Sequence, residues 1–250
     1  VSNPNGTLTV TARALTITAD NRSKTYGDAV SWAGREFTTT GLINGNTVTG
    51  VTLNSTGAAA TATVAGSTYP IVATAASGTG LNNYDITYVN GALTVDKANL
   101  TVANTDRSKV YGTALADADF AGSITGIQNS DNITLTRNST GAAATAAAGS
   151  TYPIVATLAD PDSKLGNYTV SNPNGTLTVT QKALTVTADN RSKTYGDAVT
   201  FAGTEFTTTG LINGNTVTSV TLNSTGAVAT ATVAGSTYPI VATTASGTGL

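Results

Sequence analysis

Apolar and polar residues alternate in short runs along the whole chain. Leu15, Ile17 and Ala19 alternate with threonines, and the same alternation returns around Leu100 and Leu184. A period of two residues is typical of a strand that buries one face. The chain contains no long run with the period of an amphipathic helix. The pattern therefore predicts a mainly β fold.

Turn-forming residues between these runs indicate how the strands connect. Alternating runs flank Asn90-Gly91 and Asn174-Gly175. Asn-Gly between two such runs favours a hairpin, because a type I′ turn needs positive φ twice. Pro70 and Pro153 fall beside further runs and suggest edge strands, since proline cannot donate to a ladder. Residues 41–47 could hold one short helical turn.

Two motifs recur along the chain at a fixed spacing. Ser-Lys-x-Tyr-Gly occurs three times, with its tyrosine at Tyr26, Tyr111 and Tyr195. Thr-Tyr-Pro also occurs three times at a similar spacing. Self-similarity at one period indicates a repeat array, here with modules of about 84 residues.

A longer period lies above the module. Residues 1–81 align without gaps with residues 170–250 and differ at nine positions, whereas the middle module is less similar to either neighbour. Two module types, A and B, therefore alternate. We expect the end of a preceding B-type module at 1–11, an A-type module at 12–96, a B-type module at 97–180 and a C-terminally truncated A-type module at 181–250. The last module lacks the counterpart of residues 82–95 and should expose a sheet edge.

The joints between modules are short and contain neither glycine nor proline. Asp96-Lys97-Ala98 separates the last predicted strand of one module from the first of the next. Since linker composition sets stiffness, we expect an elongated, fairly stiff rod. Each module is near the size at which a domain can fold alone. The strand pattern leaves a β-grasp-like module and an immunoglobulin-like sandwich both open.

Composition narrows the function classes. Only 10% of residues are charged, against about 25% in typical soluble domains. His and Cys are absent, so most transition-metal sites and nucleophile–base pairs cannot be built, and we expect no enzyme activity. The net charge is −2 without a basic stripe, which argues against nucleic acid as a partner. No apolar run approaches the roughly 20 residues of a membrane helix.

Two Asp-x-Asp pairs are the candidate metal ligands. Paired carboxylates in a loop supply the hard oxygens that Ca²⁺ prefers. Neither pair continues into a complete calcium-binding loop motif, so solvated loop acids are the simpler interpretation and no cofactor is expected. The candidate residues are Asp117, Asp119, Asp160 and Asp162.

Four motifs follow one another in the A-type modules. They are Leu-Thr-x-Thr-Ala-Asp-Asn-Arg-Ser-Lys-Thr-Tyr-Gly-Asp (15–28 and 184–197), Gly-Leu-Ile-Asn-Gly-Asn-Thr (41–47 and 210–216), Thr-Tyr-Pro-Ile, and a closing Asn-Gly-x-Leu-Thr-Val. Their order and spacing resemble the MBG/YDG-type repeat modules of very large bacterial adhesins. The B-type module departs from the pattern, with Thr113 where the A-type module has Asp28.

The resemblance implies a role at the cell surface. Such proteins are similar to filamentous-haemagglutinin-like or biofilm adhesins, secreted to the bacterial surface, where the repeats form a stalk. Neighbouring modules would then be the partners, and other regions would contact the host surface or biofilm matrix. Two alternatives remain: weak glycan or matrix binding that gains by avidity, and self-association of module edges between fibres.

Overall fold

The computed structural model describes residues 1–250 and confirms the mainly β class. Strands contain 44% of the residues, and every helical element is a short 3₁₀ turn. None of these turns has the length and apolar character of a bilayer-spanning helix. The 3₁₀ turns are η1 (Thr56–Ala58), η2 (Val64–Gly66), η3 (Leu81–Asn83), η4 (Asp117–Asp119), η5 (Thr140–Ala142), η6 (Leu165–Asn167), η7 (Thr225–Ala227) and η8 (Val233–Gly235).

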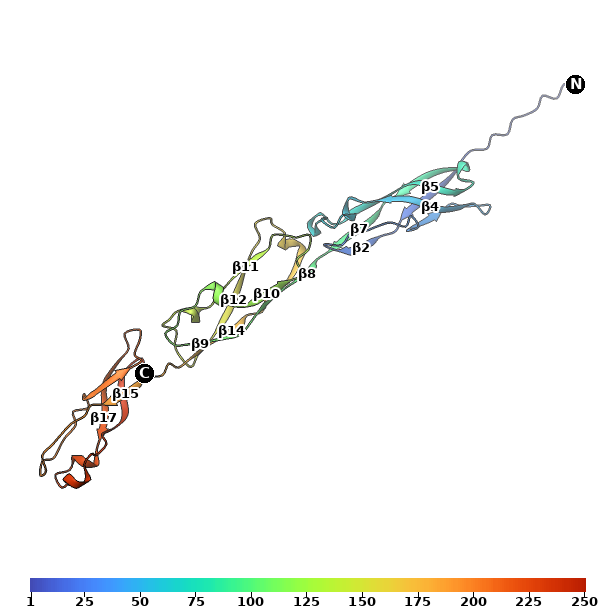
Figure 1. Ribbon diagram of the computed structural model, residues 1–250. Helices are drawn as coiled ribbons and strands as arrows, with labels where there is room; N and C mark the ends of the chain where they lie inside the picture. The colour runs from blue at the N-terminus through green and yellow to red at the C-terminus, as the bar shows by residue number, and fades with distance from the viewer. The chain divides into compact units, whose positions relative to one another are not determined.

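The first A-type module is a two-sheet sandwich. One sheet has the order β3-β1-β6 and the other β2-β7-β5-β4, with four strands of the second sheet labelled in Figure 1. The strands are β1 (Arg13–Ala19), β2 (Arg22–Thr25), β3 (Phe37–Thr40), β4 (Thr47–Asn54), β5 (Tyr69–Thr79), β6 (Tyr84–Val89) and β7 (Gly91–Asp96).

One apolar core lies between the two sheets. Leu15 and Ile17 from β1 pack with Ile71 from β5 and Leu93 from β7, and all four side chains are fully buried. The alternating run of β1 was thus correctly predicted to bury one face. Seven strands without an α-helix agree with a sandwich rather than a β-grasp-like module. The pairs β1–β6 and β2–β7 are parallel, unlike the antiparallel pairing of an immunoglobulin sandwich.

The predicted hairpin at Asn90-Gly91 is wrong. β6 pairs with β1 and β7 pairs with β2 and β5, so the chain crosses from one sheet to the other at this point. Gly91 is required for a close approach rather than for a turn. A Cβ atom there would lie 2.6 Å from the Ala19 carbonyl oxygen. Gly175, after Asn174, likewise begins a strand in a different sheet from the one before it.

The two prolines do not mark edge strands, because the strands that contain them lie inside their sheets. Pro70 is opposite Ala92 of β7, whereas pairing with β4 begins only at Val72. β5 therefore changes partner between residues 71 and 72. The missing N–H of Pro70 falls before the ladder with β4 begins, where it removes no hydrogen bond of that ladder.

The B-type module repeats the two-sheet arrangement. Its sheets have the orders β10-β8-β13 and β11-β12-β14-β9. The strands are β8 (Ala98–Asn104), β9 (Arg107–Val110), β10 (Gly122–Thr125), β11 (Thr134–Asn138), β12 (Thr151–Ala159), β13 (Tyr168–Ser171) and β14 (Gly175–Thr180).

The second A-type module contains two two-stranded sheets, β15-β16 and β17-β18. Its strands are β15 (Thr185–Ala188), β16 (Phe206–Thr209), β17 (Thr216–Asn223) and β18 (Val241–Thr248).

The chain divides into two compact units whose boundary runs through the B-type module. Unit 1 contains the first A-type module with residues 122–136 and 156–173 of the B-type module. Unit 2 contains residues 104–121 and 137–155 with residues 174–250. Each joint between consecutive modules therefore lies inside one compact unit.

Candidate functional site: the joints between modules

The Tyr-Gly pair of the first A-type module stands at the end of β2. The backbone N–H of Tyr26 donates to the Asp96 carbonyl (2.8 Å), and the N–H of Gly27 donates to the Ala60 carbonyl (3.1 Å). Gly27 has a φ of 98°, which favours glycine. The Tyr26 side chain is only 2% exposed, although it lies beyond the last paired residue of β2. Its partners come from the B-type module.

A tight turn of the B-type module receives this tyrosine. The N–H of Asp131 donates to the Gln128 carbonyl (2.8 Å), and the two residues between them have φ of 52° and 57°. The N–H of Gln128 donates to the Tyr168 hydroxyl (2.9 Å), which ties the turn to the start of β13. We call Gln128, Asn129, Asp131 and Tyr168 the socket. The corresponding A-type segment, 41–47, also holds a turn at residues 44 and 45 rather than the expected helical turn.

Tyr26 and the socket form one hydrogen-bonded aromatic cluster. The rings of Tyr26 and Tyr168 meet edge to face, with centroids 5.5 Å apart. Both hydroxyls donate to the Asp131 carboxylate, at 3.0 Å from Tyr26 and 2.6 Å from Tyr168. Hydrogen bonds to a charged acceptor are stronger than neutral ones. The buried side chains packed with this pair are Val95, Ala98, Leu100 and Ile133.

Two amide side chains extend the joint on either side of the aromatic pair. The Asn129 amide donates to the Ala60 carbonyl (3.1 Å), and the Asn167 carbonyl oxygen accepts from the Val64 N–H (2.9 Å). Asn167 is 4% exposed. The joint therefore contacts the A-type module at Tyr26 and at the loop that contains Ala60 and Val64.

Burial in this cluster changes the acidity of the two phenols. Burial raises the pKa of Tyr26, and hydrogen bonding to Asp131 raises it further, against a lowering contribution from the Asn129 side chain. Burial, followed by the hydrogen bond to Asp131, also raises the pKa of Tyr168. Both hydroxyls therefore stay protonated as donors well above neutral pH.

In the joint between the B-type module and the second A-type module, the hydrogen bond to the tyrosine hydroxyl runs in the opposite direction from that in the first joint. The Asn215 amide stands where the B-type module has Asp131, and it donates to the Tyr111 hydroxyl oxygen (3.1 Å). Asn213 donates to the Ala144 carbonyl (3.0 Å), as Asn129 does in the first joint. Hydrogen bonds from Asn213 and Asn215 lower the pKa of Tyr111. The tyrosine therefore meets a carboxylate in the first joint and an amide in the second.

A buried lysine supports each joint from within its own module. Lys24 is 7% exposed, and its Nζ donates to the carbonyls of Asp28 (2.9 Å) and Ala59. Lys109 makes the same pair of bonds in the B-type module and is 5% exposed. Burial lowers the pKa of both amines. Since Ala59 precedes the Ala60 carbonyl used in the joint, Lys24 positions that loop.

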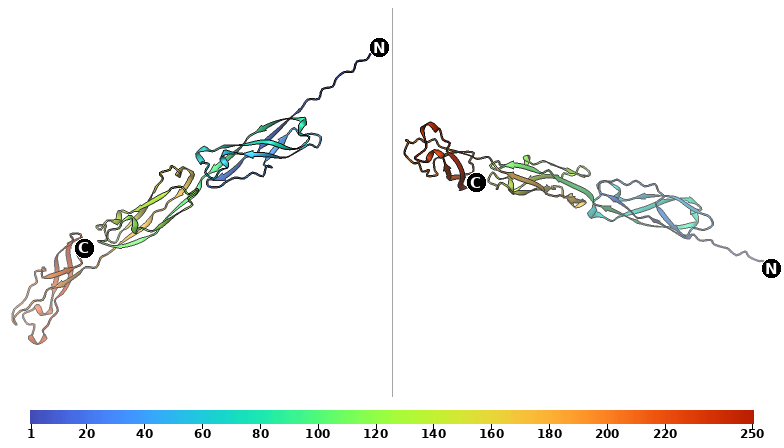
Figure 2. Two further views of the ribbon diagram at one scale, coloured as in Figure 1. Left: turned by 45° about the horizontal axis from the view of Figure 1, so that its top comes forward. Right: turned by 90° about the horizontal axis from the view of Figure 1, so that it is seen from below.

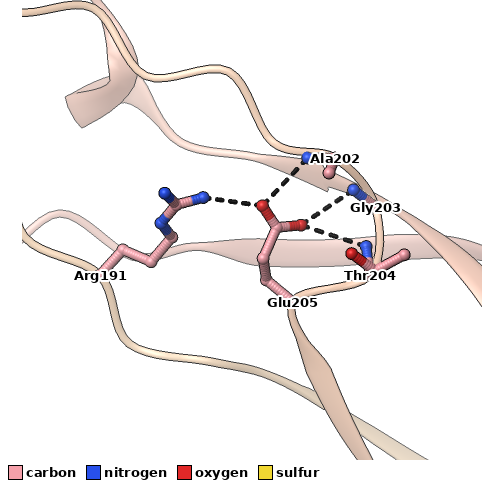
Figure 3. Close-up of polar contacts among 5 residues, drawn as sticks. All are labelled: Arg191, Ala202, Gly203, Thr204 and Glu205. Atoms are coloured by element: carbon pink, nitrogen blue, oxygen red, sulfur yellow. Dashed lines mark hydrogen bonds and ion pairs between the residues drawn. The ribbon is translucent and has the colours of Figure 1, made fainter.

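A carboxylate cradled by backbone N–H groups recurs in both A-type modules. Glu205 accepts from the N–H groups of Ala202, Gly203 and Thr204 and pairs with Arg191 at 2.7 Å (Figure 3). The bond from Ala202 is the main reason that the pKa of Glu205 is lowered. In the first module the equivalent arginine instead lies 5.5 Å from the ring centroid of Trp32. The exchange of Trp32 for a phenylalanine accompanies this change of partner.

The calcium candidates lie in separate loops and cap local structure. Asp119 accepts from the Ala116 N–H (2.8 Å), and Asp117 accepts from the Arg137 N–H. Asp160 accepts from two N–H groups of the η6 loop, both at 2.7 Å. Asp162 is exposed. The chain gathers no group of three or more metal-ligating side chains. The expectation that these residues are loop acids rather than calcium ligands stays a prediction.

Sequence reasoning did not identify the joint as a site. The signal was present, because Lys24 of β2 and Tyr26 just after it are two residues apart, as side chains on one face of an extended chain are, and all three copies repeat the pair. The partners of Tyr26 lie more than a hundred residues further along the chain. Local periodicity cannot reveal contacts at that separation.

The fold and the joints define a tandem β-repeat protein. The family model for the MBG domain (YGX type) matches residues 15–94, 100–178 and 184–248. The chain belongs to this family, which confirms the resemblance inferred from the motifs. Neither a curated protein nor a solved structure matches the chain.

Proposed function

We propose that this chain is part of the stalk of a large secreted bacterial surface adhesin, with no catalytic role. Tandem MBG repeats are consistent with adhesin-like repeat modules, and MBG domains are typical of extracellular adhesin-like proteins. In this role the modules hold a distal adhesive region away from the cell during attachment or biofilm formation. Host or matrix partners bind that other region, and each module's direct partner is its neighbour.

The observation that carries the proposal is the shared core of the joint. Tyr26 of one module and Tyr168 of the next are both 2% exposed and bond to one carboxylate. A stalk must resist bending where its modules meet. Buried aromatic contact between neighbours supplies that resistance, with roughly 0.5–1.5 kcal/mol from the ring pair beyond the burial of its area. A flexible tether would need no such contact.

Small-angle scattering on a protein of two complete A–B pairs tests the stalk, across a tenfold concentration range. We expect a maximum dimension near four module lengths, about 120 Å at roughly 30 Å each, unchanged with concentration. Tyr26→Ala, with the equivalent tyrosine of the second A-type module also changed to alanine, should broaden the distribution of interatomic distances in the particle. Tyr88→Ala, inside the sandwich, should not. A compact wild-type particle would contradict the stalk. Mass growing with concentration would instead favour cohesion between fibres.

A further inference from the structure

In the first A-type module, the first two strands pair in parallel with the last two, β1 with β6 and β2 with β7 (Figure 2). Arg13 of β1 lies opposite Tyr84 of β6, which is 71 residues further along the chain. Thr25 of β2 lies opposite Asp96 of β7, again 71 residues further along. The two pairs belong to different sheets. One register therefore continues where both stretches cross from the first sheet to the second.

A hydrogen bond in the same register bridges the crossing itself. The Asn21 side chain, between β1 and β2, accepts from the Ala92 N–H at 2.7 Å. These two residues are also 71 positions apart. Residues 13–25 and 84–96 are thus connected in each sheet and at the crossing between the sheets. We call these two stretches, and their counterparts in the B-type module, the clamp.

The B-type module keeps the same arrangement with a different sequence. β8 pairs in parallel with β13, and β9 pairs in parallel with β14. Ala98 lies opposite Tyr168, 70 residues further along the chain, and the other pairs keep this spacing. At the crossing the Asp106 side chain accepts from the Thr176 N–H at 2.7 Å, at the same spacing. The clamp is therefore a property of the fold rather than of one module's sequence.

The clamp also contributes buried side chains to the core of each module. Low local dielectric makes a hydrogen bond electrostatically stronger. Buried apolar side chains along the clamp therefore favour its backbone hydrogen bonds. The clamp side chains that are at most 2% exposed include Leu15, Ile17, Leu93, Val95, Leu100, Val102, Leu177 and Val179.

Parallel pairing decides how a pull along the chain acts on the clamp. Tension enters a module at the start of its first strand and leaves at the end of its last strand. Because parallel stretches start at one end and finish at the other, this tension draws them past each other along their length. The hydrogen bonds between them then share the load and break together. Two strands pulled apart at one shared end would instead lose their bonds one at a time.

We propose that the clamp is a load-bearing device that resists unfolding when the chain is pulled along its length. Its use in the cell rests on the stalk proposed above, because a stalk that holds an adhesive region is placed under tension. Only Lys97 separates β7 from β8, so the clamp of one module transmits load directly to the next. Forced unfolding is governed by the unfolding rate rather than by equilibrium stability. The clamp therefore protects the fold under load whatever its equilibrium stability.

Single-molecule pulling of the full chain in two directions is the first test. The chain has no cysteine of its own, so DNA handles attach only at engineered ones. Handles at Asn3→Cys and Lys97→Cys load the clamp of the first module along its length. Handles at Asn3→Cys and Asp85→Cys separate β1 from β6 at the end where both start, because Asp85 lies opposite Ala14. We expect the first module to unfold at a several-fold lower force in the second arrangement.

A hydrogen bond of the same kind outside the clamp provides the matched control. Asn21→Ala removes the bond at the crossing. Thr79→Ala removes an exposed bond between β4 and β5, in which the Thr47 N–H donates to the Thr79 hydroxyl at 3.0 Å. With handles at residues 3 and 97, Asn21→Ala should raise the unfolding rate at constant force about fivefold, the factor expected for one hydrogen bond. Thr79→Ala should leave that rate unchanged, whereas urea unfolding should show similar small losses for both variants.

Two results would overturn the proposal. They are equal unfolding forces in the two directions of pulling, and equal effects of Asn21→Ala and Thr79→Ala on the unfolding rate under load. Neither result depends on the dimensions that small-angle scattering measures, so the clamp and the stalk can fail independently.

Discussion

Asp131 and Asn215 occupy the same position in the two kinds of socket, and their chemistry sets the direction of the joint's hydrogen bond. A carboxylate only accepts, so Tyr26 donates to Asp131. The amide nitrogen of Asn215 donates, so Tyr111 accepts. A single residue therefore decides whether the phenol of the preceding module acts as donor or acceptor.

Removing the Asp131 carboxylate from the first joint should lower the free energy of unfolding more than replacing it with a neutral amide. Asp131→Ala leaves two buried hydroxyls without their partner, and we expect the free energy of unfolding to fall by about 1–3 kcal/mol. Asp131→Asn keeps one acceptor oxygen, so its free energy of unfolding should fall by less. Urea unfolding measures both, with Asp162→Asn as an exposed control. Equal losses for the two Asp131 variants would contradict the assigned hydrogen bonds.

The two buried phenols of the first joint should make the chain sensitive to alkali. Their folded pKa values are raised, so they bind protons that the unfolded chain releases above its pKa of about 10. The stabilisation is complete below that pH and is lost as pH rises further. Thermal unfolding from pH 8 to 11.5 should show a decline that Tyr26→Phe/Tyr168→Phe reduces. Parallel declines in both proteins would argue against this origin.

At the scale of elements, the alternation of side chains predicted strands correctly but not their pairing. β1 buries Leu15 and Ile17 as its pattern indicated. The Asn-Gly rule failed because Gly91 serves a backbone contact with Ala19 in the crossing between sheets. The proline rule failed because β5 changes partner beside Pro70. Both errors concern contacts between distant segments, which a local pattern does not contain.

The strand β7 should be the most sensitive element of the first module. Leu93→Ala removes a fully buried side chain between the sheets. We expect the free energy of unfolding to fall by about 2–5 kcal/mol. Thr94→Ala on the opposite face should change stability by no more than about 0.5 kcal/mol. Chemical unfolding of both variants measures the difference. Similar losses of unfolding free energy in Leu93→Ala and Thr94→Ala would mean that the buried face of β7 does not stabilise the core.

At the scale of the molecule, the module boundaries given by the sequence repeat differ from the boundaries of the two compact units. The repeat predicted modules that meet at short joints, and the family match covers three tandem modules. The compact division instead passes through the B-type module, because Tyr26, Val95 and Leu100 belong to one cluster. The period could be read from the residues, whereas the shared cluster depends on packing across the joint.

Loss of the joint should loosen both modules it connects. Tyr26→Ala is expected to increase hydrogen exchange in residues 126–133 of the B-type module as well as around Ala60, since both contact this cluster. Tyr88→Ala should affect the first A-type module alone, because the Tyr88 hydroxyl accepts from the Ala76 N–H of that module. Mass-spectrometric exchange measures both variants. Unchanged exchange in residues 126–133 after Tyr26→Ala would show that the modules open independently.

The alternation of Asp131 and Asn215 has a consequence for how such a chain changes in length over evolution. Nearly identical stretches such as 1–81 and 170–250 invite unequal recombination, which adds or deletes the sequence between them. Loss of a whole A–B pair brings Tyr26-type and Asp131-type residues together again. Loss of one module would place an A-type tyrosine on an asparagine socket. Loss of one module would therefore exchange donor and acceptor at that joint, whereas loss of the pair keeps the direction of every hydrogen bond.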